Sequence, residues 1–186
     1  MDGLTLLEVY VGSQKVWPTT DAVQITLGTS AQARDQFRAA LTARGLDYQT
    51  VTEIPFGIEL VGTGSARDMF RGCAALTSVP DMDTSSVTTM RYMFQGCVAL
   101  THVPDMDTSS VTTMRYMFQG CVALTHVPDM DTSGVTDMYA MFLGCSSLTD
   151  GNVRLIGRHP NVNTVGMIDN SGLTREPFYD AAGNPI

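Results

Sequence analysis

A 24-residue repeat between Met69 and Leu148 restricts the possible folds of this chain more than any other feature. Two copies are nearly identical: residues 87–110 read VTTMRYMFQGCVALTHVPDMDTSS, and residues 111–134 differ only at the last position, where Gly134 replaces a serine. A fixed period of this length is typical of a solenoid, because each unit buries its apolar face only against its neighbours. The repeat therefore predicts a row of stacked coils.

Within one unit, the apolar residues predict a short helix followed by a short strand. The spacing i, i+3, i+4 and i+7 of one helix face is occupied by Met114, Met117, Phe118 and Cys121. We expect about two turns of helix, ended near Gly120, and then a strand from Leu124 to Val127 that Pro128 closes. This alternation indicates an α/β solenoid like that of leucine-rich repeats.

The repeat becomes weaker at both ends, which is expected of units that cover an open core. Ile54 lies about one repeat before Val79 and suggests a degenerate first coil, whereas Met167 and Leu173 suggest a divergent last one. We therefore predict an α/β fold with a leucine-rich-repeat-like solenoid of about five 24-residue coils over residues 63–174. Residues 175–186 would form a C-terminal extension.

Residues 1–62 contain no repeat and predict a separate N-terminal unit. The segment 7–18 alternates like two strands joined at Gly12-Ser13, which indicates a hairpin. A strand over 23–27, a helix over 31–44 that ends at Gly45, and a returning strand over 48–54 would form a small β-α-β unit. We expect this unit to dock onto other proteins.

Composition excludes several classes of function. The net charge of −8 argues against binding nucleic acid through its phosphates. No apolar run is long enough for a membrane span, and no basic segment precedes an apolar stretch as in a secretory signal. We find no nucleophile motif, phosphate-binding glycine loop or metal triad, so we expect neither an enzyme nor a cofactor.

The four cysteines also follow the repeat spacing, at Cys73, Cys97, Cys121 and Cys145. They occupy the inward-facing position of each unit, where a small apolar thiol fills a core. Disulfide pairing or metal binding is the alternative, but no CxxC pair supports a zinc site. We therefore interpret the cysteines as core residues.

Aspartates form two further columns along the repeats. They are Asp81, Asp105 and Asp129 in one column, and Asp83, Asp107 and Asp131 in the other. Asp at such a position usually accepts backbone N–H groups in the following turn. The alternative is a Ca²⁺ ion that bridges neighbouring coils. We favour turn capping and keep the six residues as weak calcium candidates.

Exposed-type side chains repeat in the same way and predict a binding surface. The candidates are Arg91, Tyr92, Arg115, Tyr116, His102 and His126. Tyr and Arg are residue types that interfaces favour, although a solvated face without a ligand has the same pattern. Two histidines one repeat apart are too few to define a metal site.

The string in residues 87–110 resembles the repeat DTSxVTxMxxMFxxCxxLTxxP of BspA-like, leucine-rich-repeat-related bacterial surface proteins, and the resemblance extends from Met69 to Thr149. It implies a surface-exposed solenoid for adhesion or protein contacts, without catalytic residues. The segment VYVGSQKVWP at residues 9–18 is similar to minor tail proteins of phages that infect actinobacteria. That similarity implies a virion protein, which leaves the cell by lysis without a signal peptide.

These observations favour a non-enzymatic structural and recognition protein, a phage minor tail or tail-tip component that binds the host surface. Its N-terminal third would contact other tail proteins, its coils would bind a host glycan or protein, and the chain would form a homo-oligomer on the particle. The alternative is a fragment of a bacterial or protist cell-surface adhesin. A glycan depolymerase is the third hypothesis, but the paired carboxylates Asp105 and Asp107 recur in every coil, as scaffold residues do.

Overall fold

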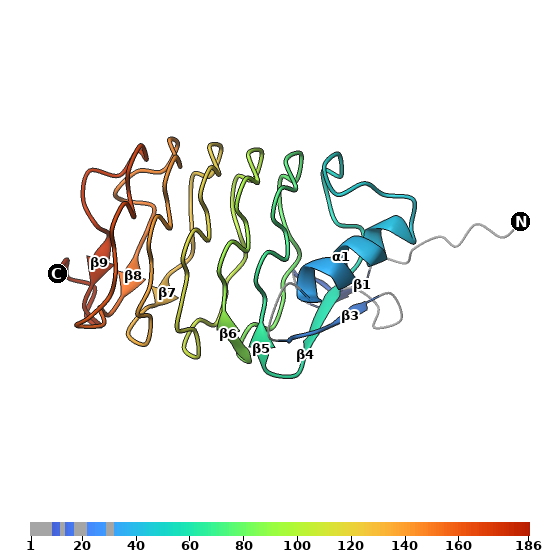
Figure 1. Cartoon of the computed structure of the whole chain (residues 1–186), viewed down its shortest axis with the longest axis horizontal. Helices are drawn as coiled ribbons and strands as arrows, with labels where there is room; N and C mark the ends of the chain where they lie inside the picture. The colour runs from blue at the N-terminus through green and yellow to red at the C-terminus, as the bar shows by residue number, and fades with distance from the viewer. Residues whose placement is uncertain (1–8, 12–13, 17–21, 29–31) are drawn as a thin grey trace, which may run out of the picture.

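The computed structural model describes residues 9–11, 14–16, 22–28 and 32–186 (Figure 1). The first described strands are β1 (Val9–Val11) and β2 (Gln14–Val16), which pair antiparallel. The two predicted strands are confirmed, while their Gly12-Ser13 connection lies outside the described residues. A β-α-β unit follows: β3 (Val23–Thr26), α1 (Gln32–Thr42) and β4 (Ile58–Val61), with β3 and β4 parallel.

Helix α1 forms where the sequence predicts it. Ala33, Phe37 and Leu41 recur at helical spacing, share one face and are buried. Gly45 lies just beyond the helix with a φ of +71°, the left-handed conformation that ends many helices.

The returning strand predicted over residues 48–54 is wrong. The amides of Thr50 and Val51 donate to the Asp47 carbonyl in a turn, and the returning strand is β4, which starts at Ile58. Asp47 explains the shift, because its carboxylate also accepts the Gln49 amide and stabilises the turn.

The repeats lie side by side as successive coils, with the first coil next to α1 and the last at the C-terminus (Figure 1). Strand β5 (Gly64–Ser65) pairs parallel with β6 (Val87–Thr89), and β7 (Met130–Asp131), β8 (Leu155–Ile156) and β9 (Phe178–Tyr179) form a parallel three-stranded sheet. Single parallel bridges continue the pairing across the coils. They continue from the Ser65–Thr89 pair of β5 and β6 and join Thr89, Thr113, Asp137 and Asn163 in order.

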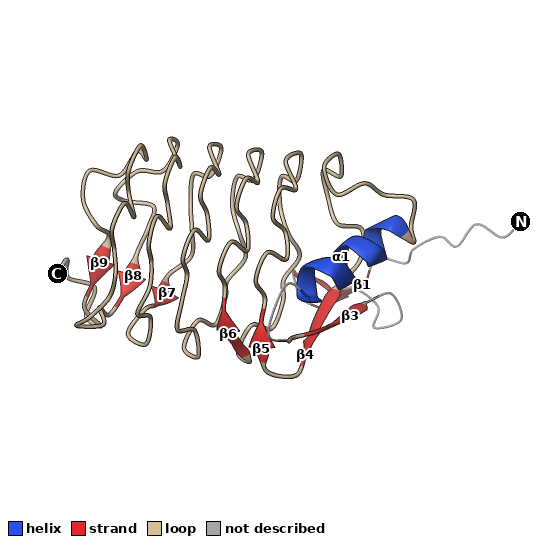
Figure 2. Cartoon of the chain, viewed as in Figure 1, coloured by secondary structure: helices blue, strands red, loops and turns tan. Residues whose placement is uncertain are grey.

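The predicted helix in each unit is not formed; among the described residues α1 is the only helix, and the repeats are turns and loops (Figure 2). The hydrogen bonds explain why. The amides of Tyr92, Phe94 and Gly96 donate to carbonyls of the next coil, and only the intervening amides close local turns. A helix would direct every amide along its own axis, so this segment gives up helical bonds for bonds between coils.

The predicted strand from Leu124 to Val127 is also not formed. The Thr125 amide donates to Thr101 in the preceding coil, whereas the Val127 amide donates to Asn152 in the following one. Because these bonds diverge, no regular strand pairing develops. The paired strands instead flank the Asp-Thr-Ser turn, as β6 and β7 do.

One continuous core runs through the coils. Phe70, Phe94, Phe118 and Phe142 are fully buried and stack nearly parallel, with centroid separations of 5.3, 5.4 and 5.7 Å. The four cysteines are free and buried beside them, as the core interpretation predicts. Each of the last three thiols donates to a phenylalanine carbonyl of a preceding coil, for example Cys97 to Phe70.

Both ends of the core are covered. Phe37 of α1 meets Phe70 edge-on at 4.9 Å and closes the N-terminal end. At the other end Met167 is buried and its carbonyl accepts the Phe142 amide, so the divergent last coil continues the stack. Beyond it, β9 pairs with β8 and buries Phe178. No helix in the described part of the chain has the length and hydropathy needed to cross a membrane.

Candidate functional site

Arginine and tyrosine side chains gather where consecutive coils make the same turn. We call this surface the Arg/Tyr face. It comprises Arg67, Asp68, Arg71, Arg91, Tyr92, Arg115, Tyr116, Asp137 and Tyr139. Arg91 and Arg115 each come two residues after a residue that pairs with the neighbouring coil, for example Arg91 after Thr89. The pairing of the coils therefore sets the spacing of the face.

The tyrosine rings stack on one another along the row of coils. Tyr92 and Tyr116 lie 5.0 Å apart with an interplanar angle of 11°, and Tyr139 meets Tyr116 edge-on at 5.2 Å. Tyr92 and Tyr116 both have positive φ, +58° and +57°. This left-handed conformation is unusual for a tyrosine, so the stack and the bonds between coils must stabilise it.

Guanidinium groups cover the remaining ring surface. Arg67, Arg71 and Arg91 lie 5.4–5.6 Å from the centre of the Tyr92 ring. Arg115 lies 5.1 Å from the Tyr116 ring and 4.3 Å from the Tyr139 ring. Cation–π attraction stabilises such contacts and keeps the arginines on this face.

Two carboxylates neutralise part of this positive charge. Asp68 is only 2% exposed and forms ion pairs with Arg67 at 3.1 Å and Arg71 at 3.3 Å. Asp137, from the next coil, lies 3.7 Å from Arg115. The pKa of Arg115 is raised: burial opposes its charge, but Asp137 and the hydroxyls of Tyr92 and Tyr116 outweigh that effect.

Arg91 has no such partner. Within the described residues no carboxylate lies within 4.0 Å of its guanidinium. Its buried Nε lacks a hydrogen-bond acceptor, as does the Nε of Arg115. Asp137 is the residue of the next coil that lies opposite Arg115. The equivalent residue opposite Arg91 is Thr113. Arg91 is thus a half-buried cation beside the Tyr92 ring, and no carboxylate of the described residues neutralises its charge.

The structure therefore brings together four of the six sequence-predicted binding residues. Sequence reasoning missed Arg67, Arg71, Tyr139 and the two aspartates of the face. Extending the repeat register would have found Arg67 and Tyr139, which lie in the column of Arg91 and Arg115. Arg71 lies in the column of Gln95, which was not a candidate column. Asp68 and Asp137 gave no such signal, because they are departures from the repeat.

His102 and His126 lie elsewhere on the coil and are exposed. The Thr101 hydroxyl lies 3.0 Å from His102 Nδ1. In the described residues no hydrogen bond, ion pair or aromatic contact joins either histidine to the Arg/Tyr face. The histidines are therefore a second, separate candidate surface.

One of the two aspartate columns caps the turns that follow it. Asp83, Asp107 and Asp131 each accept the amide of the serine two residues later, at 2.9–3.0 Å. Hydrogen bonds from the hydroxyl and then the amide of Ser85 and Ser109 lower the pKa of Asp83 and Asp107. No group of three metal-ligating side chains occurs in the described part of the chain, where the structure places the six calcium candidates.

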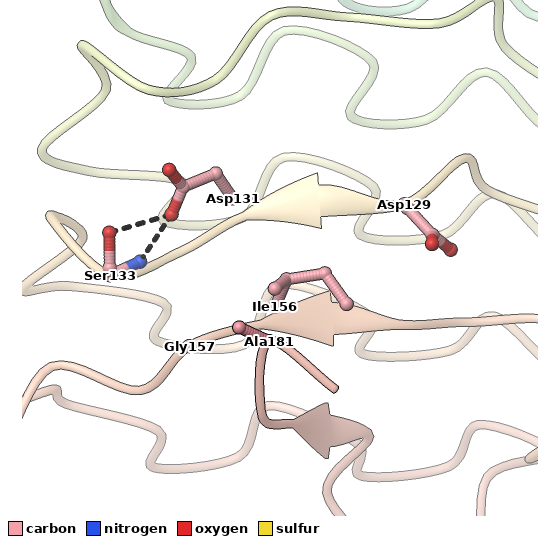
Figure 3. A pocket seen from close by; sticks show the side chains of 6 residues that line it. All are labelled: Asp129, Asp131, Ser133, Ile156, Gly157 and Ala181. Atoms are coloured by element: carbon pink, nitrogen blue, oxygen red, sulfur yellow. Dashed lines mark hydrogen bonds between the residues drawn. The ribbon is translucent and has the colours of Figure 1, made fainter. Parts of the chain in front are cut away.

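A pocket of about 400 Å³ lies between the last coils (Figure 3). Its lining residues are Asp129, Asp131, Ser133, Ile156, Gly157 and Ala181. Its two carboxylates are already engaged: Asp131 accepts the amide and hydroxyl of Ser133, and Asp129 pairs with Arg154 at 3.1 Å. Both carboxylates of the pocket therefore have protein partners, one in a turn and one in an ion pair, which does not favour an acid–base catalytic role for them.

Comparison with known proteins gives one family and one solved structure. The family model described as "Mycoplasma protein of unknown function, DUF285" matches residues 64–170. A crystal structure of a leucine-rich repeat protein from Eubacterium ventriosum ATCC 27560 is 25% identical, with a TM-score of 0.45, over 64% of this chain and 32% of that one. This chain thus spans about a third of that protein's length. No curated protein matches.

Proposed function

The chain belongs to the DUF285 family, and from this premise we propose that it is a non-enzymatic recognition protein that contacts a cell-surface ligand through its Arg/Tyr face. The repeat is of the BspA-like, leucine-rich-repeat-related type, which is generally surface-associated. One observation supports the assignment to this face most strongly: the half-buried Arg91 lies beside the Tyr92 ring without a carboxylate partner in the described residues.

More specifically, we propose that the stacked coils form a solenoid at the tip of a phage tail. The N-terminal unit would dock onto other tail proteins, the chain would form a homo-oligomer on the virion, and the coils would bind a glycan or protein of the host surface. The similarity of residues 9–18 to minor tail proteins supports this version. An adhesin of a bacterial or protist cell surface remains the second candidate, and the family's repeat favours it.

Binding to cell envelopes tests the recognition function. The full chain is sedimented with purified envelopes of several actinobacteria and other Gram-positive bacteria, and retention is measured against a protein of similar size and charge. We expect saturable retention on at least one envelope. Retention no greater than that of the control on every envelope would contradict the proposal.

Two matched variants test which surface is used. Tyr92→Asn with Tyr116→Asn removes two rings of the Arg/Tyr face, and asparagine tolerates the positive φ of these positions. His102→Ala with His126→Ala alters the exposed histidines to the same extent. We expect the first pair to reduce envelope retention about ten-fold or more and the second to leave it unchanged; the reverse result would move the binding site to the histidines.

Antibody labelling distinguishes the phage from the cellular version. Gold-labelled antibody against this chain should mark tail tips of virions if the chain is a tail protein, and the outer face of intact cells if it is an adhesin. Release of new reducing ends from envelope polysaccharide by the purified chain would instead support the depolymerase hypothesis. We expect none, because Asp107 is occupied by the turn to Ser109.

A further inference from the structure

We propose that the Arg/Tyr face binds carboxylate groups of an acidic polysaccharide, with Arg91 as the principal contact; this inference rests on the recognition function proposed above. The first argument is charge. The chain as a whole has a net charge of −8, yet this face places four guanidinium groups against two carboxylates. A local excess of positive charge on an acidic protein attracts an anionic group to this place.

The second argument is the pairing pattern of the arginines. In the flanking coils each guanidinium faces a carboxylate of the protein itself: Asp68 serves Arg67 and Arg71, and Asp137 serves Arg115. Arg91, in the middle of the row, has Thr113 at the position equivalent to Asp137, and no carboxylate pairs with it among the described residues. Arg67 likewise has Thr89 at that position, but Asp68 of its own coil pairs with it. A ligand carboxylate at Arg91 would therefore repeat an interaction that the face already makes on both sides, and guanidinium–carboxylate pairs are strong and directional.

The third argument concerns the tyrosines. Their ring faces are covered by one another, by Tyr139 and by the arginines, so they offer no free surface for stacking on a sugar ring. What remains are hydroxyls and ring edges, which suit the hydrogen-bonding groups of a polysaccharide. The face thus favours polar, charge-assisted recognition over aromatic stacking.

Nucleic acid fits the face less well. Duplex DNA presents a negative charge about every 1.7 Å along its axis, and its binding requires neutralisation of many phosphates. Here the one arginine of the face that lacks a carboxylate partner among the described residues is flanked by Asp68 and Asp137, and the surrounding chain is acidic. A polymer with about one carboxylate per sugar carries a lower charge density and avoids most of this repulsion.

Direct titration of the full chain tests the inference. Polygalacturonate is the probe, and fully methyl-esterified polygalacturonate of the same length is the control, because esterification removes the charge and keeps the sugar backbone. Binding is measured by isothermal titration calorimetry at low ionic strength. We expect saturable binding of the acid form only, with an affinity that falls as salt is added.

Three variants assign the binding to Arg91. Arg91→Gln should lower the affinity about ten-fold or more, whereas Arg175→Gln removes the same charge from an exposed C-terminal position and should have little effect. Thr113→Asp places a carboxylate opposite Arg91, as Asp137 places one opposite Arg115. It should fold, because Asp137 bonds the amide of Tyr139 as Thr113 bonds that of Arg115. The change removes the hydrogen bond that the Thr113 hydroxyl donates to the Asp137 carbonyl, so we expect a lower melting temperature with unfolding still cooperative. We expect it to weaken binding as much as Arg91→Gln.

The outcomes separate this inference from the proposed function. Equal binding of the acid and the ester, or equal loss in Arg91→Gln and Arg175→Gln, would overturn the carboxylate assignment. Envelope retention that polygalacturonate does not displace would also overturn it and leave the recognition function intact. Absence of envelope retention together with specific polygalacturonate binding would instead remove the proposed biological role and keep the site.

Discussion

At the scale of single residues, the left-handed conformation determines the shape of each coil. One column of positive φ contains Asp68, Tyr92, Tyr116, Ala140 and Gly166, and a second contains Gly72, Gly96, Gly120, Gly144 and Asn170. The second column is almost entirely glycine, as expected where no side chain is needed. The first accepts larger residues, and two of them are the tyrosines of the Arg/Tyr face. The proposed binding surface and the strained backbone therefore share these two positions.

Gly120→Ala tests how much the left-handed turn contributes. A Cβ at Gly120 would meet only Gly96 Cα, at 3.9 Å, so space is available and the cost comes from φ. We expect the free energy of unfolding to fall by about 1–2 kcal/mol in urea denaturation. Gly134→Ser is the control, because Ser110 holds this position in the preceding repeat, and it should stay within about 0.5 kcal/mol of the wild type. Equal effects of the two changes would contradict this account.

The turn-capping aspartates predict that the free energy of unfolding decreases at acidic pH. The pKa of Asp107 is lowered in the folded chain by the hydroxyl and then the amide of Ser109. Its contribution is therefore fully present above the pKa of the unfolded chain, near 4, and is lost as the pH falls through the folded value. Ser109→Ala should raise the pKa of Asp107, measured by NMR titration, and reduce the loss of stability below about pH 4. An unchanged Asp107 pKa would remove the role of the serine.

At the scale of elements, sequence reasoning succeeded with the buried columns and failed with secondary structure. Phe94 and Cys97 were correctly placed in one core, because inward-facing positions recur whatever backbone connects them. The spacing of Met114, Met117 and Phe118 also suits a helix, and only the hydrogen bonds between coils exclude it. A positive φ at Tyr116 has no sequence signal, since tyrosine seldom adopts it. Helix α1 was predictable because its amides bond within the element.

Buried threonines show how neighbouring coils are held together. Thr108 is 2% exposed, and its hydroxyl donates to the Asp131 carbonyl of the next coil at 2.9 Å. Thr108→Val keeps the shape but leaves that carbonyl without this donor, so we expect a loss of about 1–3 kcal/mol in the free energy of unfolding. Thr112→Val removes a similar bond, to Thr88, at an exposed position. Water replaces it there, and a loss as large as that of Thr108→Val would refute the interpretation.

At the scale of the whole molecule, the Arg/Tyr face is a regular row interrupted by exceptions. The repeat spacing made Arg91 and Arg115 predictable as neighbours. It could not show that they differ, because that difference comes from Asp137 in a coil that departs from the repeat. The identical copies define the scaffold, and the divergent coils supply Asp68 and Asp137, which pair with every arginine of the face except Arg91. The binding candidate is thus a product of both.

Insertion of a third copy of residues 87–110 after Ser110 tests this view of the molecule. Every coil would meet the neighbour that it meets now, so the longer chain should fold, with a urea m-value larger by about an eighth, in proportion to its length. The added arginine again faces a threonine, which gives two unpaired guanidinium groups and should tighten polygalacturonate binding several-fold. Insertion of only residues 87–98 shifts the core columns out of register and should abolish cooperative unfolding. If the half-repeat is tolerated equally well, continuous columns do not hold the coils together; if the full repeat leaves affinity unchanged, Arg91 is not the contact.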